Sequence, residues 1–404
     1  MKRSGSADLP LHYGHVPPWL AERMSKLGLA IIETIAAEFS TSEVVSKLSN
    51  PFWFQSLGAV MGMDWHSSGI TTSVLGALKR SVNPHSKELG IYICGGKGKH
   101  SLQTPAELLI VGERTGLNGH ELGNNSKLAA KVDNTAIQDG FQLYMHSFIV
   151  SNSGEWAVIQ QGMNANTKTA RRYHWHSENL QSFVHEPHTY ICGENQGLIL
   201  NLTDKNALTA RNATLEISRE HPDKILREIN HLVMPDHHDV RAKDVNSKRL
   251  GAMLWLTHEK QPADFEELLL LKGMGPRALQ SLALVSEVIY GTPSRFEDPA
   301  RFSFAHGGKD GHPFPVPVKI YDETISTLKI AIEKAKIGNS DKLDAIRKLS
   351  DLSRQAEQNF IPNTNIQAVI QKEREDSWKY GGRTIFGEAK PPSKINPGDQ
   401  LKLF

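Results

Sequence analysis

The hydrophobic pattern of the chain changes its period near residue 210. Between residues 52 and 202, short apolar runs alternate with Gly, Asn and Ser breaks, a pattern typical of strands and turns. From about Thr214 onward, amphipathic stretches of helical period follow one another instead. The sequence therefore predicts an α+β protein in which a mixed α/β domain precedes an all-helical one.

The predicted elements divide the chain into three segments. Residues 20–50 have a helical period, with Ser40 as a cap for a second helix. Strands are predicted at 90–94, 108–111, 143–150 and 156–160, and helices at 225–233, 240–259, 264–271, 278–290, 321–337 and 341–359. We expect a mixed α/β domain, the possible catalytic domain, over 1–213, a helical domain over 214–360 and a mobile tail over 361–404.

Composition excludes several classes of protein. The 404 residues carry a net charge of +2, too little for a histone-like binder, so a nucleic-acid surface would need local clusters of Lys and Arg. No apolar run of about 18 residues occurs, and no signal peptide follows Met1, so we expect a cytoplasmic protein without a membrane partner. Cys94 and Cys192 are too few for a disulfide framework, a four-cysteine zinc site or an iron–sulfur cluster.

A glycine-rich turn lies between two predicted helices of the second domain. Residues 271–279 read Leu-Lys-Gly-Met-Gly-Pro-Arg-Ala-Leu, which matches the helix-hairpin-helix pattern of Leu, any residue, then Gly-hydrophobic-Gly. Gly273 and Gly275 would let backbone N–H groups beside a helix N-terminus hold a DNA phosphate without reading the bases. Lys272 and Arg277 would add charged contacts. The alternative is a plain helical hairpin.

The wider stretch 264–291 resembles endonuclease III-like DNA glycosylases. That resemblance implies a catalytic aspartate in a following Gly/Pro-rich loop, where Asp298 and Asp310 are the candidates and Asp310 ranks first. Arg277 stands where bifunctional members of the family carry a lysine nucleophile. Because a guanidinium stays protonated, this departure argues against a Schiff-base lyase. The alternative for Asp310 is a surface Asp-Gly turn.

The densest set of polar residues lies in the α/β domain and comprises Asp133, Asp139, His146, Gln160, Gln161, Arg171, Arg172 and His174. One interpretation is an active-site wall, in which the carboxylates bind a metal or move protons and the arginines face phosphate. Tyr173 and Trp175 could then stack on an unpaired base. The alternative makes the aspartates turn residues and the two glutamines part of an internal hydrogen-bond network.

Metal and nucleotide motifs are incomplete. A magnesium nuclease would pair an aspartate with Glu-X-Lys on a later strand, but residues 155–157 read Glu-Trp-Ala. Mg²⁺ and Mn²⁺ stay the candidate metals for a variant site. The turn at residues 94–101 has the wrong glycine spacing for nucleotide hydrolysis, so we expect no nucleotide cofactor. Its glycines with Lys97 and Lys99 could still cradle a DNA phosphate.

Over nearly its whole length the chain is similar to an uncharacterised bacterial and archaeal family, domain of unknown function seven-six-three. The similarity rests on residues 95–101, 138–140, 160–163, 171–175 and 306–311. This similarity identifies related proteins but indicates no activity.

The last five residues, Gln-Leu-Lys-Leu-Phe, resemble the peptide by which bacterial repair factors bind the replication sliding clamp. Leu401, Leu403 and Phe404 could fill an apolar cleft while Gln400 makes a directional hydrogen bond. The alternative is a tail that docks on its own protein.

Three functions are compatible with these features. The first is a DNA-processing or repair nuclease whose α/β domain cuts damaged or structured DNA while the helical domain holds it. The second is a monofunctional glycosylase, with Asp310 stabilising an oxocarbenium ion. The third is a non-catalytic adaptor that brings a partner to clamp-loaded DNA.

Overall fold

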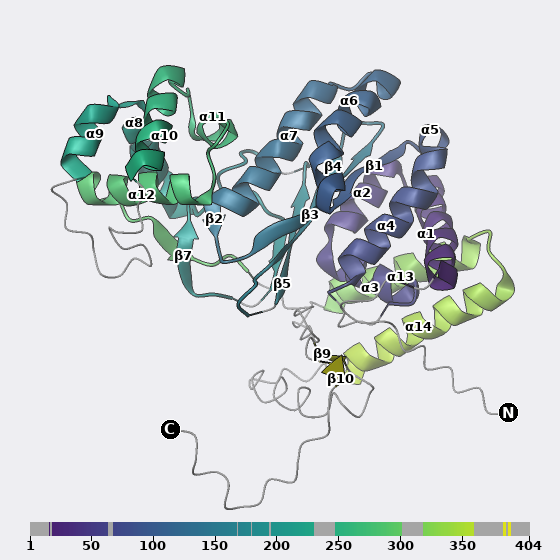
Figure 1. The fold of residues 1–404 in the computed structure, drawn as a ribbon. Helices are drawn as coiled ribbons and strands as arrows, with labels where there is room; N and C mark the ends of the chain where they lie inside the picture. The colour runs from purple at the N-terminus through teal and green to yellow at the C-terminus, as the bar shows by residue number, and fades with distance from the viewer. Residues whose placement is uncertain are drawn as a thin grey trace, which may run out of the picture.

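The fold was analysed in a computed structural model (Figure 1). The structure describes residues 16, 18–63, 68–167, 169–178, 180–193, 195–229, 247–300, 318–358, 383–384 and 387–388. All structural statements below refer to these residues.

A five-stranded antiparallel sheet forms the centre of the molecule. Its strands are ordered β1 (Ile91–Lys97), β3 (Gln142–Ser151), β4 (Trp156–Met163), β5 (Ala170–His176) and β6 (Tyr190–Cys192). The register places His146 of β3 opposite Gln160 of β4, and Gln160 opposite Tyr173 of β5. Because side chains alternate along a strand, these three side chains share one face of the sheet.

Helices from both ends of the chain cover the other face. They are α1 (Pro18–Glu38), α2 (Thr41–Ser49), α3 (Pro51–Val60), α4 (Ile70–Val82), α13 (Val318–Lys334) and α14 (Asn339–Gln358), with the short α5 (Ser86–Leu89) beside them. Leu20, Trp53 and Ile159 share one buried core with Leu328 and Leu349. The Ser40 side chain accepts a hydrogen bond from the Glu43 N–H (3.0 Å), which confirms the predicted cap.

The first face, with His146 and Gln160, is covered by α6 (Thr104–Thr115), α7 (Gly119–Lys131) and a π-helical turn, η3 (Val132–Ala136). Beyond them lies a second antiparallel sheet of β2 (Ile137–Gln138), β7 (Leu198–Asn201) and β8 (Arg295–Glu297). Five helices pack with it: α8 (Leu208–Arg219), α9 (Pro222–Ile229), α10 (Ser247–Lys260), α11 (Phe265–Leu270) and α12 (Pro276–Tyr290). A strand pair, β9 (Arg383–Thr384) and β10 (Gly387–Glu388), completes the described elements.

Most predicted elements are confirmed, and one strand is wrong. Helices α1 and α2 occupy most of residues 20–50, strand β1 contains all but the first residue of the run at 90–94, and strands β3 and β4 contain the runs at 143–150 and 156–160. Residues 108–111 belong to helix α6 instead. Leu108 and Val111 are buried, whereas Leu109 and Ile110 between them are 36 % and 47 % exposed, which is helical and not strand spacing.

The packing units differ from the predicted domains. The predicted boundary at residues 213 and 214 falls inside α8, and strand β8 lies within the segment predicted to be all-helical. Helices α13 and α14 pack on α1 and α3, not on α8–α12, as Figure 1 shows. An amphipathic period identifies a helix but not the layer that its apolar face joins, which is why the sequence grouped these helices together.

Among the described helices, none is both long enough and apolar enough to cross a membrane.

Candidate functional site

Strand β5 divides the predicted site residues between the two faces of the central sheet. Arg171, Tyr173 and Trp175 point to one face, and Arg172 and His174 to the other. We call the first set the Asp133 network, comprising Asp133, Asp139, His146, Gln160, Arg171, Tyr173, Trp175, His188 and Asp298. We call the second set the Arg172 cluster, comprising Gln55, Thr71, Gln161, Arg172 and His174.

The π-helical turn η3 directs the Asp133 carboxylate into the buried side of the sheet. Asp133 is fully buried and accepts hydrogen bonds from Trp175 Nε1 (2.9 Å), from Gln160 Nε2 and from His188 Nε2. Three donors thus hold this one carboxylate in place. A π-helical turn is rare and often occurs at functional sites, so this position is the natural starting point of a candidate site.

His146 is held in one neutral tautomer by its partners. Gln160 donates through its Nε2 to the Ala129 carbonyl (3.2 Å) and to Asp133, so its Oε1 accepts from His146 Nδ1 (2.8 Å). His146 Nε2 therefore accepts from the Ser126 hydroxyl (2.8 Å). Burial lowers the pKa of His146, which keeps the ring uncharged. Both ring nitrogens are occupied, so His146 has no nitrogen left to act as a base on a substrate.

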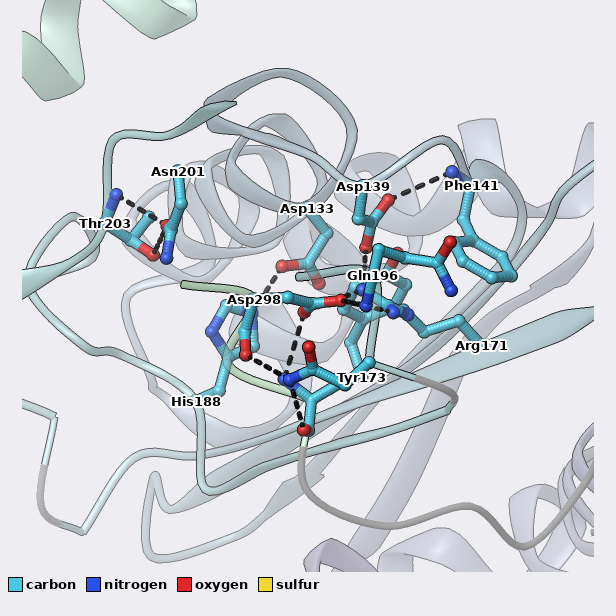
Figure 2. A network of polar contacts seen from close by, with 12 residues as sticks. Asp133, Asp139, Phe141, Arg171, Tyr173, His188, Gln196, Asn201, Thr203 and Asp298 are labelled. Atoms are coloured by element: carbon cyan, nitrogen blue, oxygen red, sulfur yellow. Dashed lines mark hydrogen bonds and ion pairs between the residues drawn. The ribbon is translucent and has the colours of Figure 1, made fainter. Parts of the chain in front are cut away.

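Arg171 joins two carboxylates from distant parts of the chain, Asp139 and Asp298 (Figure 2). Its Nη1 donates to Asp139 Oδ2 (2.7 Å), and Nη1 and Nη2 donate to the Asp298 oxygens (3.0 and 2.6 Å). The Tyr173 hydroxyl also donates to Asp139 (2.7 Å). Burial alone would lower the pKa of Arg171, but the two carboxylates raise it above its usual value. The guanidinium thus stays charged inside the protein.

His188 is the member of the Asp133 network nearest the surface. Its ring lies 4.3 Å from the Trp175 ring, and its side chain is 7 % exposed. Because Nε2 donates to Asp133, the ring is oriented with Nδ1 away from the carboxylate. Within the described part of the chain Nδ1 has no hydrogen-bond partner. This carboxylate–imidazole pair is the arrangement by which a histidine acts as a general base.

The buried positions correct several predicted roles. Arg171 and Arg172 are 0 % and 5 % exposed, and both donate to protein side chains, so neither presents its guanidinium to DNA phosphate. Tyr173 and Trp175 are fully buried and are not free to stack on a base. Helices cover both faces of the central sheet, whereas the active-site interpretation places Arg171, Arg172 and His174 against phosphate. The alternative interpretation, an internal hydrogen-bond network around Gln160, describes this region better.

The remaining carboxylates give no metal cluster in the residues that the structure describes. No group of three or more His, Cys, Asp or Glu side chains there has the geometry to hold a metal ion. Asp298, one of the two aspartates considered for glycosylase chemistry, is bound to Arg171 and to the N–H groups of Gln196 (2.8 Å) and Ala300 (3.0 Å). Asp310, the other, lies outside the described residues, as do Gln400, Leu401, Leu403 and Phe404.

The glycine-rich turn between α11 and α12 lies at the surface. Lys272, Gly273 and Arg277 are exposed, while Met274 is fully buried and anchors the turn. Gly273 has φ +94°, which a residue with a side chain rarely adopts. Gly275 precedes α12 with no side-chain cap on the helix. The first N–H groups of α12 are therefore available to an anion.

Two hydrogen bonds attach this turn to the neighbourhood of the Asp133 network. Lys131 Nζ, at the end of α7, donates to the Met274 carbonyl, and Gln138 Nε2 donates to the Pro276 carbonyl (2.7 Å). The turn η3, which carries Asp133, also packs against α11 and α12. The surface hairpin and the Asp133–His188 pair thus belong to adjoining elements.

The second predicted phosphate contact lies elsewhere, at the end of β1. Lys97 and Lys99 are exposed, and Lys97 Nζ lies 5.9 Å above the Tyr144 ring. Gly95 and Gly98 adopt positive φ in this turn, as its glycine-rich sequence predicts. No hydrogen bond or ion pair of the described residues joins these lysines to the hairpin.

Sequence reasoning missed His188 and Ser126. His188 follows Pro187 in a loop, 55 residues from the aspartate that it contacts, so no local pattern marks it. Ser126 lies within a helix, where serine usually indicates no more than a tolerated polar position. A histidine two residues before an apolar strand was the available signal, and it is a weak one.

Comparison with known proteins identifies the chain through one family model. Neither the curated proteins nor the solved structures searched contain a match to this chain. The model described as protein of unknown function (DUF763) matches residues 5–316, which include both sheets and helices α1–α12. The chain belongs to this family.

Proposed function

We propose that this protein is a cytoplasmic DNA-binding protein of DNA processing or repair, and that the hairpin at residues 271–277 grips the duplex backbone. The observation that carries the proposal is an uncapped helix N-terminus flanked by two exposed cations, Lys272 and Arg277. Backbone N–H groups at such a site bind phosphate whatever the base sequence. The hairpin would therefore recognise DNA shape and not base identity.

The packing of the turn supports this role. Met274 is buried and Leu279 is fully enclosed in the same core, so the turn is held from below while its outer side stays polar. Lys131 and Gln138 fix the carbonyls of Met274 and Pro276 from the opposite side. With its carbonyls held inward, the turn presents N–H groups and positive charge outward, as a phosphate site requires.

The test is the salt dependence of DNA binding. Replacing Lys272 and Arg277 by Ala should weaken binding to a labelled duplex about tenfold or more at low salt, because two charged phosphate contacts are lost. The slope of log K against log salt concentration should become shallower by about 2, since each contact releases about 0.9 of a counterion. Fluorescence anisotropy at several KCl concentrations measures both.

Lys336→Ala provides the matched control, because Lys336 is exposed but lies beyond α13, away from the hairpin. It should leave affinity and slope unchanged. If the double hairpin variant bound DNA with wild-type affinity and slope, the hairpin would not be the DNA-binding surface.

The Asp133–His188 pair favours a second element of the proposal, hydrolysis of bound DNA. With Asp133 fixing Nε2, the lone pair on His188 Nδ1 can take a proton from water as the water oxygen attacks phosphorus. The P–O3′ bond would break, and the same proton would pass to the 3′ oxygen. Attack at C1′ would instead release a base, which is the glycosylase alternative. In both reactions His188 has the same role.

His188→Gln should reduce either reaction by about 10²–10⁴-fold, the usual contribution of a general base. Labelled duplex, branched and modified DNAs should be incubated with Mg²⁺, with Mn²⁺ and with EDTA, scoring strand breaks and abasic sites separately. His185→Gln is the control, because His185 is exposed in the same loop. Wild-type rates in His188→Gln would exclude this role, and DNA binding without turnover would support the adaptor function.

The sliding clamp remains the proposed protein partner, on the Gln-Leu-X-Leu-Phe pattern of residues 400–404 alone.

A further inference from the structure

Two consecutive arginines of β5 have opposite electrostatic surroundings. Arg171 is neutralised by Asp139 and Asp298 on one face of the sheet. Arg172, on the other face, is 5 % exposed and forms no ion pair with any carboxylate that the structure describes. A buried cation without a counter-charge costs several kcal/mol. No carboxylate among the described residues therefore balances the charge of the Arg172 guanidinium.

The neighbours of Arg172 within the described residues are neutral. Its Nη2 donates to Gln55 Oε1 (3.0 Å) and its Nη1 to Thr71 Oγ1 (3.4 Å), and its Cζ lies 4.9 Å from the centre of the Phe54 ring. Cys192 is also within hydrogen-bonding reach, but burial raises the pKa of this thiol to about 12. The thiol therefore stays protonated at neutral pH and brings no negative charge.

Other polar atoms of the Arg172 cluster also lack partners. Gln161 lies opposite Arg172 in the strand register, and it donates through Nε2 to the Ser68 carbonyl (3.1 Å). Its Oε1 and Arg172 Nε have no hydrogen-bond partner in the described structure. One ring nitrogen of His174 lies near the Ser49 backbone without a well-formed hydrogen bond, and the other has no partner. All three side chains are at least nine-tenths buried. Buried polar groups are nearly always paired, so several unpaired ones in one place indicate a bound group.

We propose that the Arg172 cluster binds a small phosphate anion, either inorganic phosphate or the phosphate of a monoester. Arg172 Nε–H supplies a donor, and the guanidinium supplies the charge. Gln55 from α3 and Thr71 from α4 hold the guanidinium in place from the helical layer.

The unpaired acceptors select phosphate over sulfate. Gln161 Oε1 and the second nitrogen of His174 can only accept hydrogen bonds, since burial, followed by the charge of Arg172, lowers the pKa of His174 far enough to keep it neutral. Inorganic phosphate carries a P–OH near neutral pH, and a phosphate monoester carries one in its monoanionic form. This group donates to such an acceptor, whereas sulfate has no proton to offer. A site that recognises an anion by its charge alone would lack these hydrogen-bond acceptors.

Thermal unfolding and calorimetry test the proposal on the full chain. The melting temperature of the wild-type protein should rise in phosphate relative to chloride at equal ionic strength, and rise less in sulfate, because a ligand of the native state stabilises it. Arg172→Met should abolish the phosphate-dependent rise and melt no lower than the wild type in chloride, since it removes an uncompensated buried charge. Arg211→Met is the control: Arg211 is buried on α8 with carbonyl partners, so the phosphate response should persist.

A second variant decides the outcome if Arg172→Met fails to fold. Gln161→Leu should weaken phosphate binding about tenfold or more in calorimetry while leaving sulfate binding unchanged. The affinities for inorganic phosphate and for a nucleoside monophosphate distinguish the two sources of the anion. The compound that binds more tightly is the ligand. Equal melting temperatures of the wild type in phosphate, sulfate and chloride would overturn the proposal and assign the unpaired atoms to buried water. A phosphate response retained in Arg172→Met would overturn it as well.

Discussion

Replacing Arg171 by Met should lower the free energy of unfolding by about 3–5 kcal/mol. The substitution removes the cation that lies between Asp139 and Asp298 and leaves two carboxylates buried close together without a counter-charge. Their mutual repulsion adds to the loss of three hydrogen bonds between the guanidinium and the two carboxylates. Urea unfolding followed by circular dichroism measures the change.

A triple variant separates charge from packing. Arg171→Met combined with Asp139→Asn and Asp298→Asn removes all three charges, so it should recover a large part of the lost stability. Lys224→Met breaks an exposed ion pair with Glu220 and should cost no more than about 1 kcal/mol. If Arg171→Met and Lys224→Met lowered the free energy of unfolding by the same small amount, the buried ion pairs of Arg171 would stabilise the fold no more than an exposed ion pair does.

Gly95→Ala should destabilise the protein by about 2–5 kcal/mol, from a left-handed backbone and from overpacking. Gly95 has φ +85°, and a Cβ there would lie 2.3 Å from the His146 carbonyl oxygen and 2.5 Å from Thr104 Oγ1. The backbone of β3 cannot move away cheaply, because it is paired on both sides in the sheet. Denaturant unfolding of the variant measures the cost.

Gly98 provides a matched control in the same turn. It also has positive φ, +58°, but an added Cβ there would meet nothing within 4 Å. Gly98→Ala should therefore cost only the conformational part, about 1–2 kcal/mol. Equal losses for the two alanines would mean that backbone conformation alone, and not the contact with His146, explains why glycine stands at residue 95.

The sequence predicts those parts of the fold that depend on neighbouring residues. The local period of the sequence marks strands β3 and β4, and its glycines mark the turn before α12. All three elements are found where predicted. Helix α6 was misread because Leu108–Val111 is four apolar residues long, too short for the period to distinguish helix from strand.

Long-range relations explain what the sequence could not predict. Arg171 and Asp298 are 127 residues apart, and Asp133 and His188 are 55 apart, so nothing local links either pair. The sequence shows that successive side chains of β5 point to opposite faces of the sheet. It does not show which faces the helices cover. The sequence alone therefore suggests one role for both arginines, whereas the fold gives them separate surroundings.

The layer of α1–α4 has a consequence for synthesis on the ribosome. Its core contains Leu20 and Ile31 but is completed by Leu328, Ile332 and Leu349 from α13 and α14, which lie beyond the family match at residue 316. At about 5–20 residues per second, roughly 15–65 s separate the translation of Leu20 from that of Leu349. Throughout this interval the nascent chain exposes an apolar helical surface, so the protein should depend on chaperones during its own synthesis more than a fold built in chain order would.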